Sequence, residues 1–387
     1  MTALAGVVLA GLDVVASGEG PPLAGRRVGL VAHAASVTAG GAHAVEVLRT
    51  RGSALARVFA PEHGLRGELA AGVAFADDLD PTSGVPVTSL YGTKRRPSLH
   101  DLRGLDTLVV DLQDAGVRFY TYASTLLLCL DAAAEANLAL LVLDRPNPLG
   151  GENVEGPVSE RPDGFVSMAL GPLVHGLTLG ELARFANARR ARPARLEVVP
   201  MRGWRRNMMW EDTGRPWTKP SPNLVSPEAA LLYPALALLE ATNVSEGRGT
   251  PTPFLRFGAP WLEAQELLGR LQIPGLAFAT DEFTPLASAL APEPKHAGEA
   301  CRGLRVRVTE GRALRPWRAG LELLQVLRRQ RAFRWLRGGA ALDALLGTTR
   351  VREALERGEP AAAIAAGDDA AVEGFRRERA AALLYWE

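Results

Sequence analysis

Residues 107–114 read TLVVDLQD, an apolar run that ends in two carboxylates and an amide. An unbroken apolar run of this kind is typical of a strand buried on both faces, in a sheet that helices cover on each side. Three other runs have the same form, and each ends at polar or proline-rich residues: Arg27–Ala32, Ala56–Ala60 and Ala139–Leu143. Ligands of such sheets bind beyond the carboxyl ends of the strands, so these four polar clusters mark the expected site.

Helical spacing of apolar residues separates these runs, at Gly41–Arg51 and Ser124–Ala136. Strands that alternate with helices predict parallel βαβ units. A further helix over Thr178–Ala188 and a strand over Leu196–Pro200 close this domain. We therefore expect residues 1–202 to form an α/β domain with a Rossmann-like, doubly wound and mostly parallel sheet.

The composition changes after Met201, where Gly203–Pro222 is rich in tryptophan and proline and reads as an irregular connection. Beyond it, the apolar pattern predicts helices over residues 227–240, 319–330, 341–346 and 373–384, and a strand over residues 304–308. We expect residues 203–387 to form a second, smaller α/β domain, with the active site in the cleft between the two domains.

The charged residues nearly balance, because 44 Lys and Arg face 43 Asp and Glu and leave a formal charge of +1. No global field therefore favours nucleic acid or an anionic membrane. The N-terminus lacks a basic region and carries Asp13 soon after its best apolar run, which argues against a signal peptide or a membrane span. We expect a cytoplasmic protein. The two cysteines, Cys129 and Cys301, lack metal or redox spacing and read as packing residues.

Several kinds of chemistry lack their motif in this sequence. It has no G-x-x-x-x-G-K-[ST] phosphate loop and no G-x-G-x-x-G turn after the first strand. It also has no H-E-x-x-H zinc motif and no G-x-S-x-G nucleophile elbow. We therefore expect neither a metal nor a cofactor, and the chemistry falls to the carboxylates of the cleft.

The turn after the second strand, PEHGLRG at residues 61–67, holds three ionisable groups. Pro61 restricts the backbone, and two glycines allow a tight turn. A Glu62 carboxyl group that is held there and partly desolvated can serve as a general acid, whereas the alternative is a glutamate that only hydrogen-bonds the loop. His63 and Arg66 are candidate substrate contacts in the same turn.

The segment 111–122, DLQDAGVRFYTY, is denser in polar groups. Asp111 either caps the helix that follows or faces the cleft. Core packing explains the other polar groups less well, so Asp114 is a candidate catalytic group. The candidate substrate contacts from this segment are Asp111, Gln113, Arg118, Tyr120 and Tyr122.

Two further turns supply candidates. Asn147, in the turn DRPNP at residues 144–148, either fixes a rigid turn or contacts the ligand. The turn NVSEGRGT at residues 243–250 offers Glu246 as a candidate catalytic acid and Arg248 as a candidate substrate contact. The alternative for this turn is a surface loop with an internal ion pair, which contributes little energy.

Three aromatic side chains, Tyr91, Trp210 and Trp217, either pack at the domain junction or offer flat surfaces to a sugar ring. Glycoside hydrolases usually carry two catalytic carboxylates, surrounded by amide and aromatic groups that bind the sugar. The residues alone therefore favour a carbohydrate-active cleft.

Six longer segments that follow one another along the chain make the functional prediction more specific. They are FAPEHGLRG, VPVTSLYGTKRRPS, DTLVVDLQDAGVRFYTYASTL, LVLDRPNPLGG, LEATNVSEGRGTPTPFLRFGAPW and KHAGEACRGLRVRV. Together they resemble the exo-β-N-acetylmuramidase NamZ family. The resemblance extends over nearly the whole chain, from about Gly11 onward.

The resemblance implies a glycoside hydrolase that removes β-linked N-acetylmuramic acid from the non-reducing ends of peptidoglycan fragments. Its partners are then peptidoglycan-derived amino sugars, and relatives are often exported. The family's catalytic glutamate corresponds to Glu62. The second catalytic carboxylate stays open between Asp111, Asp114 and Glu246.

The functional groups of this substrate predict which side chains bind it. Its lactyl carboxylate needs a cation, for which Arg118, Arg66 and Arg248 are candidates. Its 2-acetamido group can itself attack the anomeric carbon, and a carboxylate such as Asp114 or Glu246 would then orient that group. Two alternatives stay open: a hydrolase of another acidic or N-acetylated sugar, and a module that binds wall fragments without cleaving them.

Overall fold

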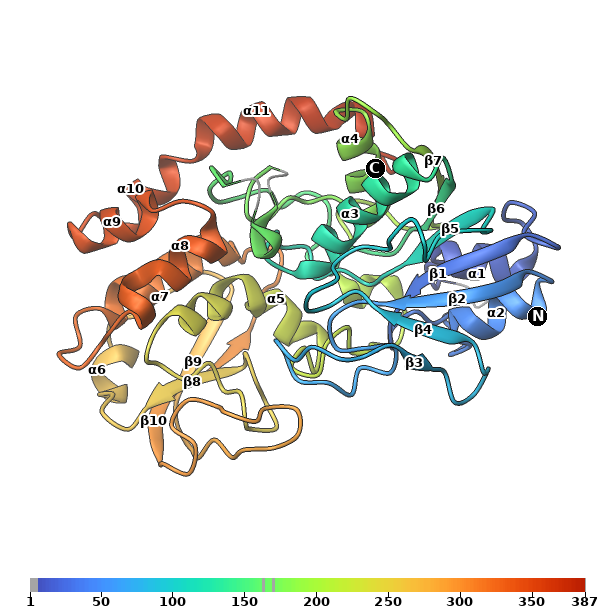
Figure 1. Ribbon diagram of the computed structural model, residues 1–387. Coiled ribbons are helices and arrows are strands. Elements are labelled where there is room, and N and C mark those ends of the chain that lie inside the picture. Colours follow the sequence, from blue (N-terminus) through green and yellow to red (C-terminus); the bar gives the residue numbers. More distant parts are fainter. Residues whose placement is uncertain (1–5, 162–163, 169–170, 387) are drawn as a thin grey trace.

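The computed structural model describes residues 6–161, 164–168 and 171–386, which form two parts that lie side by side (Figure 1). The first part holds a seven-stranded sheet with the order β3-β4-β2-β1-β5-β6-β7. Its strands are β1 (Arg27–Ala32), β2 (Ala54–Ala60), β3 (Asp78–Leu79), β4 (Pro86–Ser89), β5 (Thr107–Asp111), β6 (Ala139–Leu143) and β7 (Arg195–Val199).

The strand order confirms the predicted Rossmann-like, doubly wound sheet. Neighbouring strands pair in parallel, except that β3 pairs antiparallel with β4. The chain adds strands on one side of β1 through β2 and β4, and on the other side through β5, β6 and β7. The strand order therefore reverses between β1 and β5, and crevices at such a point receive ligands in open α/β sheets.

Helices cover both faces of this sheet, which explains the unbroken apolar runs. Helices α1 (Gly11–Ser17) and α2 (Ala44–Thr50) pack on one face, and α3 (Thr121–Glu135) and α4 (Leu179–Asn187) pack on the other. Along β5, Leu108 and Val110 join the core below α3, whereas Val109 joins the core below α1 and α2. β5 therefore needs apolar side chains on both of its faces.

The C-terminal part contains a three-stranded antiparallel sheet with the order β8-β10-β9. Its strands are β8 (Arg256–Ala259), β9 (Leu276–Phe283) and β10 (Cys301–Val308). The sequence predicted only the last of them. Most residues of β9 are at least partly exposed, so that strand lacks the apolar run by which buried strands are found.

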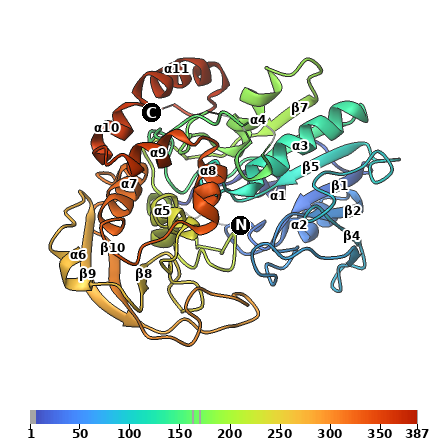
Figure 2. The ribbon, with the colours of Figure 1, turned by 60° about the vertical axis from the view of Figure 1, so that its left-hand side comes forward.

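Helices fill the rest of the C-terminal part (Figures 1 and 2). They are α5 (Pro227–Leu236), α6 (Ala264–Leu268), α7 (Pro316–Leu327), α8 (Ala340–Leu346), α9 (Arg350–Glu356), α10 (Ala361–Ala366) and α11 (Asp369–Arg379). Short 3₁₀ turns are η1 (Phe165–Ser167), η2 (Trp210–Thr213), η3 (Ala237–Ala241), η4 (Leu336–Gly339) and η5 (Ala380–Ala382). The helix predicted over 227–240 is α5 continued by η3, and the one predicted over 373–384 lies earlier, as α11.

The end of the chain returns to the first part. On α11, Phe375 packs against Phe185 of α4 with ring centroids 5.2 Å apart. The Tyr385 hydroxyl donates a 2.6 Å hydrogen bond to Oδ2 of Asp144, at the carboxyl end of β6. The hydrophobic core below α3 and α4 is continuous with that of the C-terminal part. The predicted domain boundary after residue 202 stays a prediction, and its first domain begins with residues 1–5, outside the described residues.

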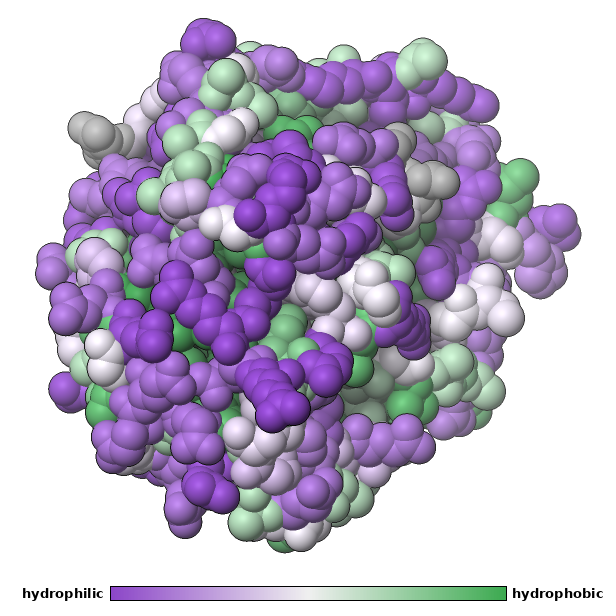
Figure 3. All heavy atoms as spheres, turned by 90° about the vertical axis from the view of Figure 1, so that its left-hand side faces the viewer, coloured by the Kyte–Doolittle hydropathy of each residue, from purple (hydrophilic) through white to green (hydrophobic). Residues whose placement is uncertain are grey.

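Three further observations complete the description of the structure. Within the described residues, no helix combines the length and the apolar character needed to cross a membrane. Hydrophilic residues dominate the face seen in Figure 3, with hydrophobic residues in small patches. Cys129 and Cys301 are both buried free thiols, as predicted from their spacing.

Candidate active site

The turn after β2 holds Glu62 in a fixed orientation. Its Oε1 accepts a 2.8 Å hydrogen bond from the backbone N–H of Gly72, and its Oε2 accepts a 2.9 Å hydrogen bond from the hydroxyl of Thr121. Thr121 is the first residue of α3, and the N-terminal end of a helix favours a nearby carboxylate. The side chain is half-buried, so the carboxylate is both anchored and accessible.

His63 gives the turn its unusual backbone, with a φ of 72° that non-glycine residues adopt only at a cost. Burial lowers the pKa of His63, although the neighbouring Glu62 carboxylate opposes part of this effect. The neutral imidazole places Nδ1 2.8 Å from the carbonyl oxygen of Leu69. Because a carbonyl only accepts, Nδ1 carries the proton and Nε2 is left as an acceptor.

These two residues line a cavity of about 150 Å³ between the two parts of the molecule. The first part contributes Tyr91, Phe119, Tyr120 and Thr121, and the C-terminal part contributes Tyr233, Glu240, Arg248, Phe254 and Leu345. The cavity therefore lies in the predicted position, beyond the carboxyl ends of the strands and against the second part.

An aromatic cluster forms one side of the cavity. The ring centroid of Tyr233 lies 5.4 Å from that of Phe119, 6.0 Å from that of Tyr120 and 4.9 Å from that of Phe254. The Tyr120 hydroxyl is buried and has no hydrogen-bond partner among the described residues. Burial and the nearby Glu62 carboxylate raise the pKa of Tyr91 to about 12, so its hydroxyl keeps its proton. The cavity thus offers flat apolar surfaces with hydroxyl groups at their edges.

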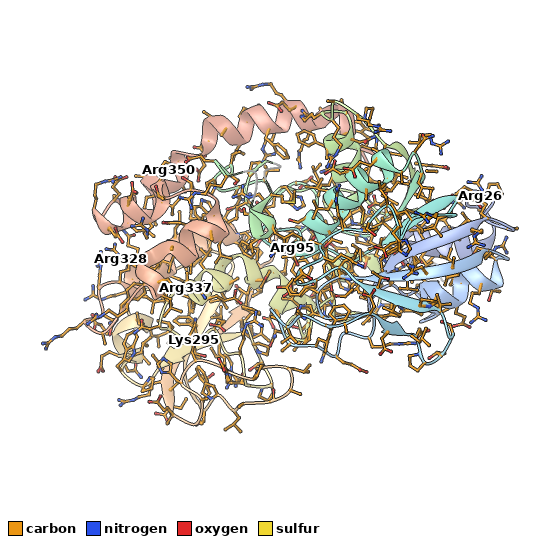
Figure 4. The ribbon with its side chains drawn as sticks, in the orientation of Figure 1. Arg26, Arg95, Lys295, Arg328, Arg337 and Arg350 are labelled. Atoms are coloured by element: carbon orange, nitrogen blue, oxygen red, sulfur yellow. The ribbon has the colours of Figure 1, made fainter. Side chains whose placement is uncertain are left out.

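A chain of alternating charges enters the cavity from the C-terminal part. Glu240 Oε1 lies 2.5 Å from Arg248 Nη2, and Arg248 Nε lies 3.4 Å from Glu246 Oε1. Glu246 Oε2 lies 2.8 Å from Lys295 Nζ, in the loop between β9 and β10 (Figure 4). Burial alone would raise the pKa of Glu246, but Lys295 and Arg248 outweigh it and lower that pKa. Of these four residues, Glu240 and Arg248 line the cavity.

Comparison with known proteins identifies the chain. Residues 28–228 match the family described as "Exo-beta-N-acetylmuramidase NamZ, N-terminal", and residues 231–385 match "Exo-beta-N-acetylmuramidase NamZ, C-terminal". The chain belongs to the NamZ family. This confirms the resemblance that the sequence segments indicated.

Relatives of known sequence and structure agree with the NamZ assignment. The "Peptidoglycan beta-N-acetylmuramidase NamZ" of Bacillus subtilis (strain 168) is 37% identical over 386 residues, which span 98% of this chain and 91% of that protein. Two DUF1343 family proteins of Bacteroides fragilis NCTC 9343 have solved structures that cover 98% of this chain and 99% of their own chains. They superpose with TM-scores of 0.87 and 0.80 at 32% and 30% identity.

Within this NamZ-family fold, five of the residues predicted from the sequence line the cavity. They are Glu62, His63, Tyr120, Arg248 and, as a flat surface, Tyr91. Tyr122 lies behind the turn: its hydroxyl is 3.1 Å from the Glu62 carbonyl oxygen and 3.0 Å from that of Pro220. Trp210 and Trp217 pack edge to face on each other, with centroids 4.7 Å apart, outside the cavity.

The polar groups at the ends of β5 and β6 lie outside the cavity and bind each other. Asp111 forms a buried two-pronged ion pair with Arg145, at 2.6 Å and 2.8 Å. The Gln113 amide donates to the carbonyl oxygens of Asp114 and Pro146. These contacts fill the crevice where the strand order reverses, so the cavity lies farther out, at the end of β2.

Asp114 and Asn147 make similar local contacts. Asp114 Oδ2 accepts a hydrogen bond from the Gly116 N–H and lies 3.6 Å from Nε2 of His175, while Oδ1 has no partner among the described residues. The Asn147 side chain donates to the Leu177 carbonyl oxygen and accepts from the Leu149 N–H. Neither side chain lines the cavity.

Two arginines expected to meet a substrate carboxylate already have other partners. Arg66 binds Asp80 at 2.5 Å on the outer side of the loop. Arg118 is buried and donates to the Ser167 hydroxyl and to the carbonyl oxygens of Pro157, Gly171 and Leu346. Burial lowers the pKa of Arg118 to about 10, so it stays charged at neutral pH.

A larger cavity, of about 310 Å³, shares no lining residue with the Glu62 cavity. Its lining includes Glu155, Trp317, Arg318, Asp368 and Arg376, and none of the residues predicted from the sequence. Burial raises the pKa of Glu155 to about 7 and that of Asp368 to about 6. We take the smaller cavity as the candidate active site because, of these two cavities, it contains the Glu62 turn. Within the described residues, no group of three or more His, Cys, Asp or Glu could hold a metal ion.

Proposed function

We propose that this chain is an exo-acting glycoside hydrolase that releases β-linked N-acetylmuramic acid from the non-reducing ends of peptidoglycan fragments. The supporting observation is the identity of 37% over 98% of the chain with a protein named peptidoglycan β-N-acetylmuramidase, together with a cavity built around Glu62.

We assign the general acid to Glu62. Two carboxylates line the cavity within the described residues, Glu62 and Glu240. Glu240 is ion-paired with Arg248, whereas Glu62 has no ion-pair partner among the described residues and accepts hydrogen bonds from uncharged donors such as the Gly72 N–H and the Thr121 hydroxyl. A carboxyl group without a cationic partner is the better proton donor to a leaving oxygen.

The remaining lining residues match a sugar with an acetamido group. The aromatic cluster of Phe119, Tyr233 and Phe254 can pack against the apolar face of the ring and the methyl group. The unpartnered Tyr120 hydroxyl can bind a sugar oxygen, which would satisfy a group that is otherwise costly to bury.

The experiment that tests this function uses chromogenic β-glycosides of N-acetylmuramic acid and of N-acetylglucosamine, and a defined fragment with N-acetylmuramic acid at its non-reducing end. We expect release of free N-acetylmuramic acid from the fragment and preference for its glycoside. Hydrolysis of the N-acetylglucosamine glycoside alone would show that the substrate is N-acetylglucosamine and not N-acetylmuramic acid. Fragment binding without product, as measured by mass spectrometry, would instead support a binding module.

A further inference from the structure

The cavity holds one carboxylate from each part of the molecule. Glu62 comes from the turn after β2, and Glu240 comes from η3, at the end of the α5 segment. The second catalytic carboxylate that the sequence left open was Asp111, Asp114 or Glu246, and none of these three side chains lines the cavity. The side chain in the position for that role is therefore Glu240.

Arg248 fixes one oxygen of Glu240 and leaves the other free. Arg248 Nη2 and Nε lie 2.5 Å and 3.1 Å from Oε1. Oε2 has no hydrogen bond within the described part of the chain, and the Glu240 side chain is 29% exposed. A carboxylate held in this way presents one acceptor oxygen to a ligand in the cavity.

Two further charged residues, Glu246 and Lys295, fix the position of Arg248. Glu246 Oε1 lies 3.4 Å from Nε of Arg248, and Glu246 Oε2 lies 2.8 Å from Nζ of Lys295. Lys295 also donates to the carbonyl oxygens of Leu239 and Val244, at 2.6 Å and 2.9 Å, on the two sides of the Glu240 position. This network of contacts restricts the movement of the Glu240 side chain.

We infer, on the basis of the proposed function, that Glu240 Oε2 accepts the N–H of the substrate's 2-acetamido group and assists that group as the nucleophile. The acetamido carbonyl oxygen bonds to the anomeric carbon while the bond to the leaving oxygen breaks. Glu62 gives its proton to the leaving oxygen, and the N–H stays hydrogen-bonded to the Glu240 carboxylate, so that an oxazolinium ion forms whose positive charge Glu240 stabilises. Water then adds to the anomeric carbon and gives a proton to Glu62, and the oxazolinium ring opens to restore the acetamido group.

Two measurements test this role. First, wild-type rates are compared for the chromogenic glycoside and its N-trifluoroacetyl analogue, whose carbonyl oxygen is a weaker nucleophile. We expect fluorination to lower kcat by about 100-fold or more. Second, calorimetry measures the affinity of Glu240→Gln for the thiazoline analogue of the oxazolinium ion and for free N-acetylmuramic acid. We expect the variant to bind the thiazoline about 100-fold more weakly and the free sugar nearly unchanged, because only the intermediate depends on the anion.

The outcomes separate this role from the proposed function. Retained binding of the free sugar shows that Glu240→Gln is folded, and Glu68→Gln, an exposed glutamate on the Glu62 loop, serves as the matched control. Equal rates for both glycosides, or thiazoline affinity that is unchanged in Glu240→Gln, would overturn the role of Glu240. A wild-type protein that cleaves neither glycoside would overturn the proposed function itself.

A separate observation concerns Arg95, on the loop that follows β4. Its guanidinium carbon lies 4.4 Å from the ring centroid of Phe165, which adjoins the cavity residue Val166. The ring of Tyr91, which also lines the cavity, lies 6.4 Å from that of Phe165. Figure 4 shows Arg95 where the two parts of the molecule meet. Arg95 is thus a cation at the mouth of the cavity.

Arg95 also differs from its neighbours in lacking a carboxylate partner within the described residues. Lys94 pairs with Asp77 and Asp101, and Arg96 pairs with Glu135. Inside the cavity, Arg248 is shared between two carboxylates. We propose, again on the basis of the proposed function, that Arg95 binds the lactyl carboxylate, the group by which N-acetylmuramic acid differs from N-acetylglucosamine.

The test compares kcat/KM for the two chromogenic glycosides in Arg95→Met, Arg95→Lys and Arg96→Met. We expect Arg95→Met to lose about 10- to 100-fold on the N-acetylmuramic acid glycoside and little on the other, with partial retention in Arg95→Lys and no change in Arg96→Met. An equal loss on both glycosides, or an unchanged preference, would overturn the assignment. The comparison requires a wild-type protein that prefers the N-acetylmuramic acid glycoside. If the wild type shows no such preference, the proposed function fails before the Arg95 variants are tested.

Discussion

The hydroxyl of Thr121, the first residue of α3, donates a 2.9 Å hydrogen bond to Oε2 of Glu62. Fifty-nine residues separate the two in sequence, and the pairing of β2, β1 and β5 brings them together. Glu62 is therefore oriented by the framework of the sheet and its helix rather than by its own loop alone.

Removing this hydroxyl weakens the orientation of the proposed acid. Thr121→Val keeps the shape of the side chain but loses a hydrogen bond of about 1 kcal/mol, so we expect kcat to fall roughly fivefold. Thr121→Ser keeps the hydroxyl and serves as the control. Steady-state kinetics would contradict this account if the serine and valine variants lost activity equally.

The ion pair between Asp111 and Arg145 is expected to stabilise the fold rather than bind substrate. Asp111→Asn leaves Arg145 buried beside a neutral group, which we expect to lower the free energy of unfolding by about 3–5 kcal/mol. Urea denaturation gives this value. A raised KM with unchanged stability would instead favour the substrate-binding role that the sequence allowed.

Arg118 joins three segments of the chain through hydrogen bonds to four acceptors. Lysine has a single ammonium group and cannot reach all of them, so we expect Arg118→Lys to destabilise the protein by about 2–4 kcal/mol. KM measured well below the unfolding transition should stay unchanged. A higher KM without loss of stability would restore Arg118 as a ligand of the lactyl carboxylate.

Glu155 predicts a pH dependence of stability. Burial raises its pKa in the folded protein to about 7 from its ordinary value of 4.5, so the folded state binds the proton more tightly between these values. Stability should therefore fall as the pH rises from about 4.5 to about 7, by up to about 3 kcal/mol from this group, and then level off. Urea unfolding of wild type and Glu155→Gln at pH 5 and pH 8 measures the difference. An equal pH dependence in the two proteins would contradict this assignment, and Glu152→Gln, an exposed neighbour, is the control.

The sheet of the first part was predictable because its central strands contain unbroken apolar runs. The predicted ranges of β1, β5 and β6 match the structure, and β2 begins two residues earlier than predicted. The antiparallel sheet of the C-terminal part was largely missed. Seven of the eight residues of β9 are at least partly exposed, so its sequence resembles that of a surface loop.

Residues of the candidate site were predictable from the sequence where they lie together in one turn. Glu62 and His63 stand out because proline and glycine mark a strained turn at a strand end. Glu240 does not stand out, since it follows an apolar helix and meets the cavity only through the packing of the two parts. The role predicted for Arg118 was not found for a similar reason: three of its four acceptors are backbone carbonyls, one of them 228 residues away, and no sequence pattern indicates such contacts.

The rate at which Glu62→Gln releases N-acetylmuramic acid from a chromogenic glycoside tests the central claim most directly. The amide keeps the size of the side chain but has no proton to give, so we expect kcat to fall by about 10²- to 10⁴-fold, with Glu68→Gln unchanged. A substrate whose leaving group needs no protonation, such as a 2,4-dinitrophenyl glycoside, should recover much of the lost rate. Wild-type turnover by Glu62→Gln, or an equal loss with both leaving groups, would contradict the assignment of Glu62 as the general acid.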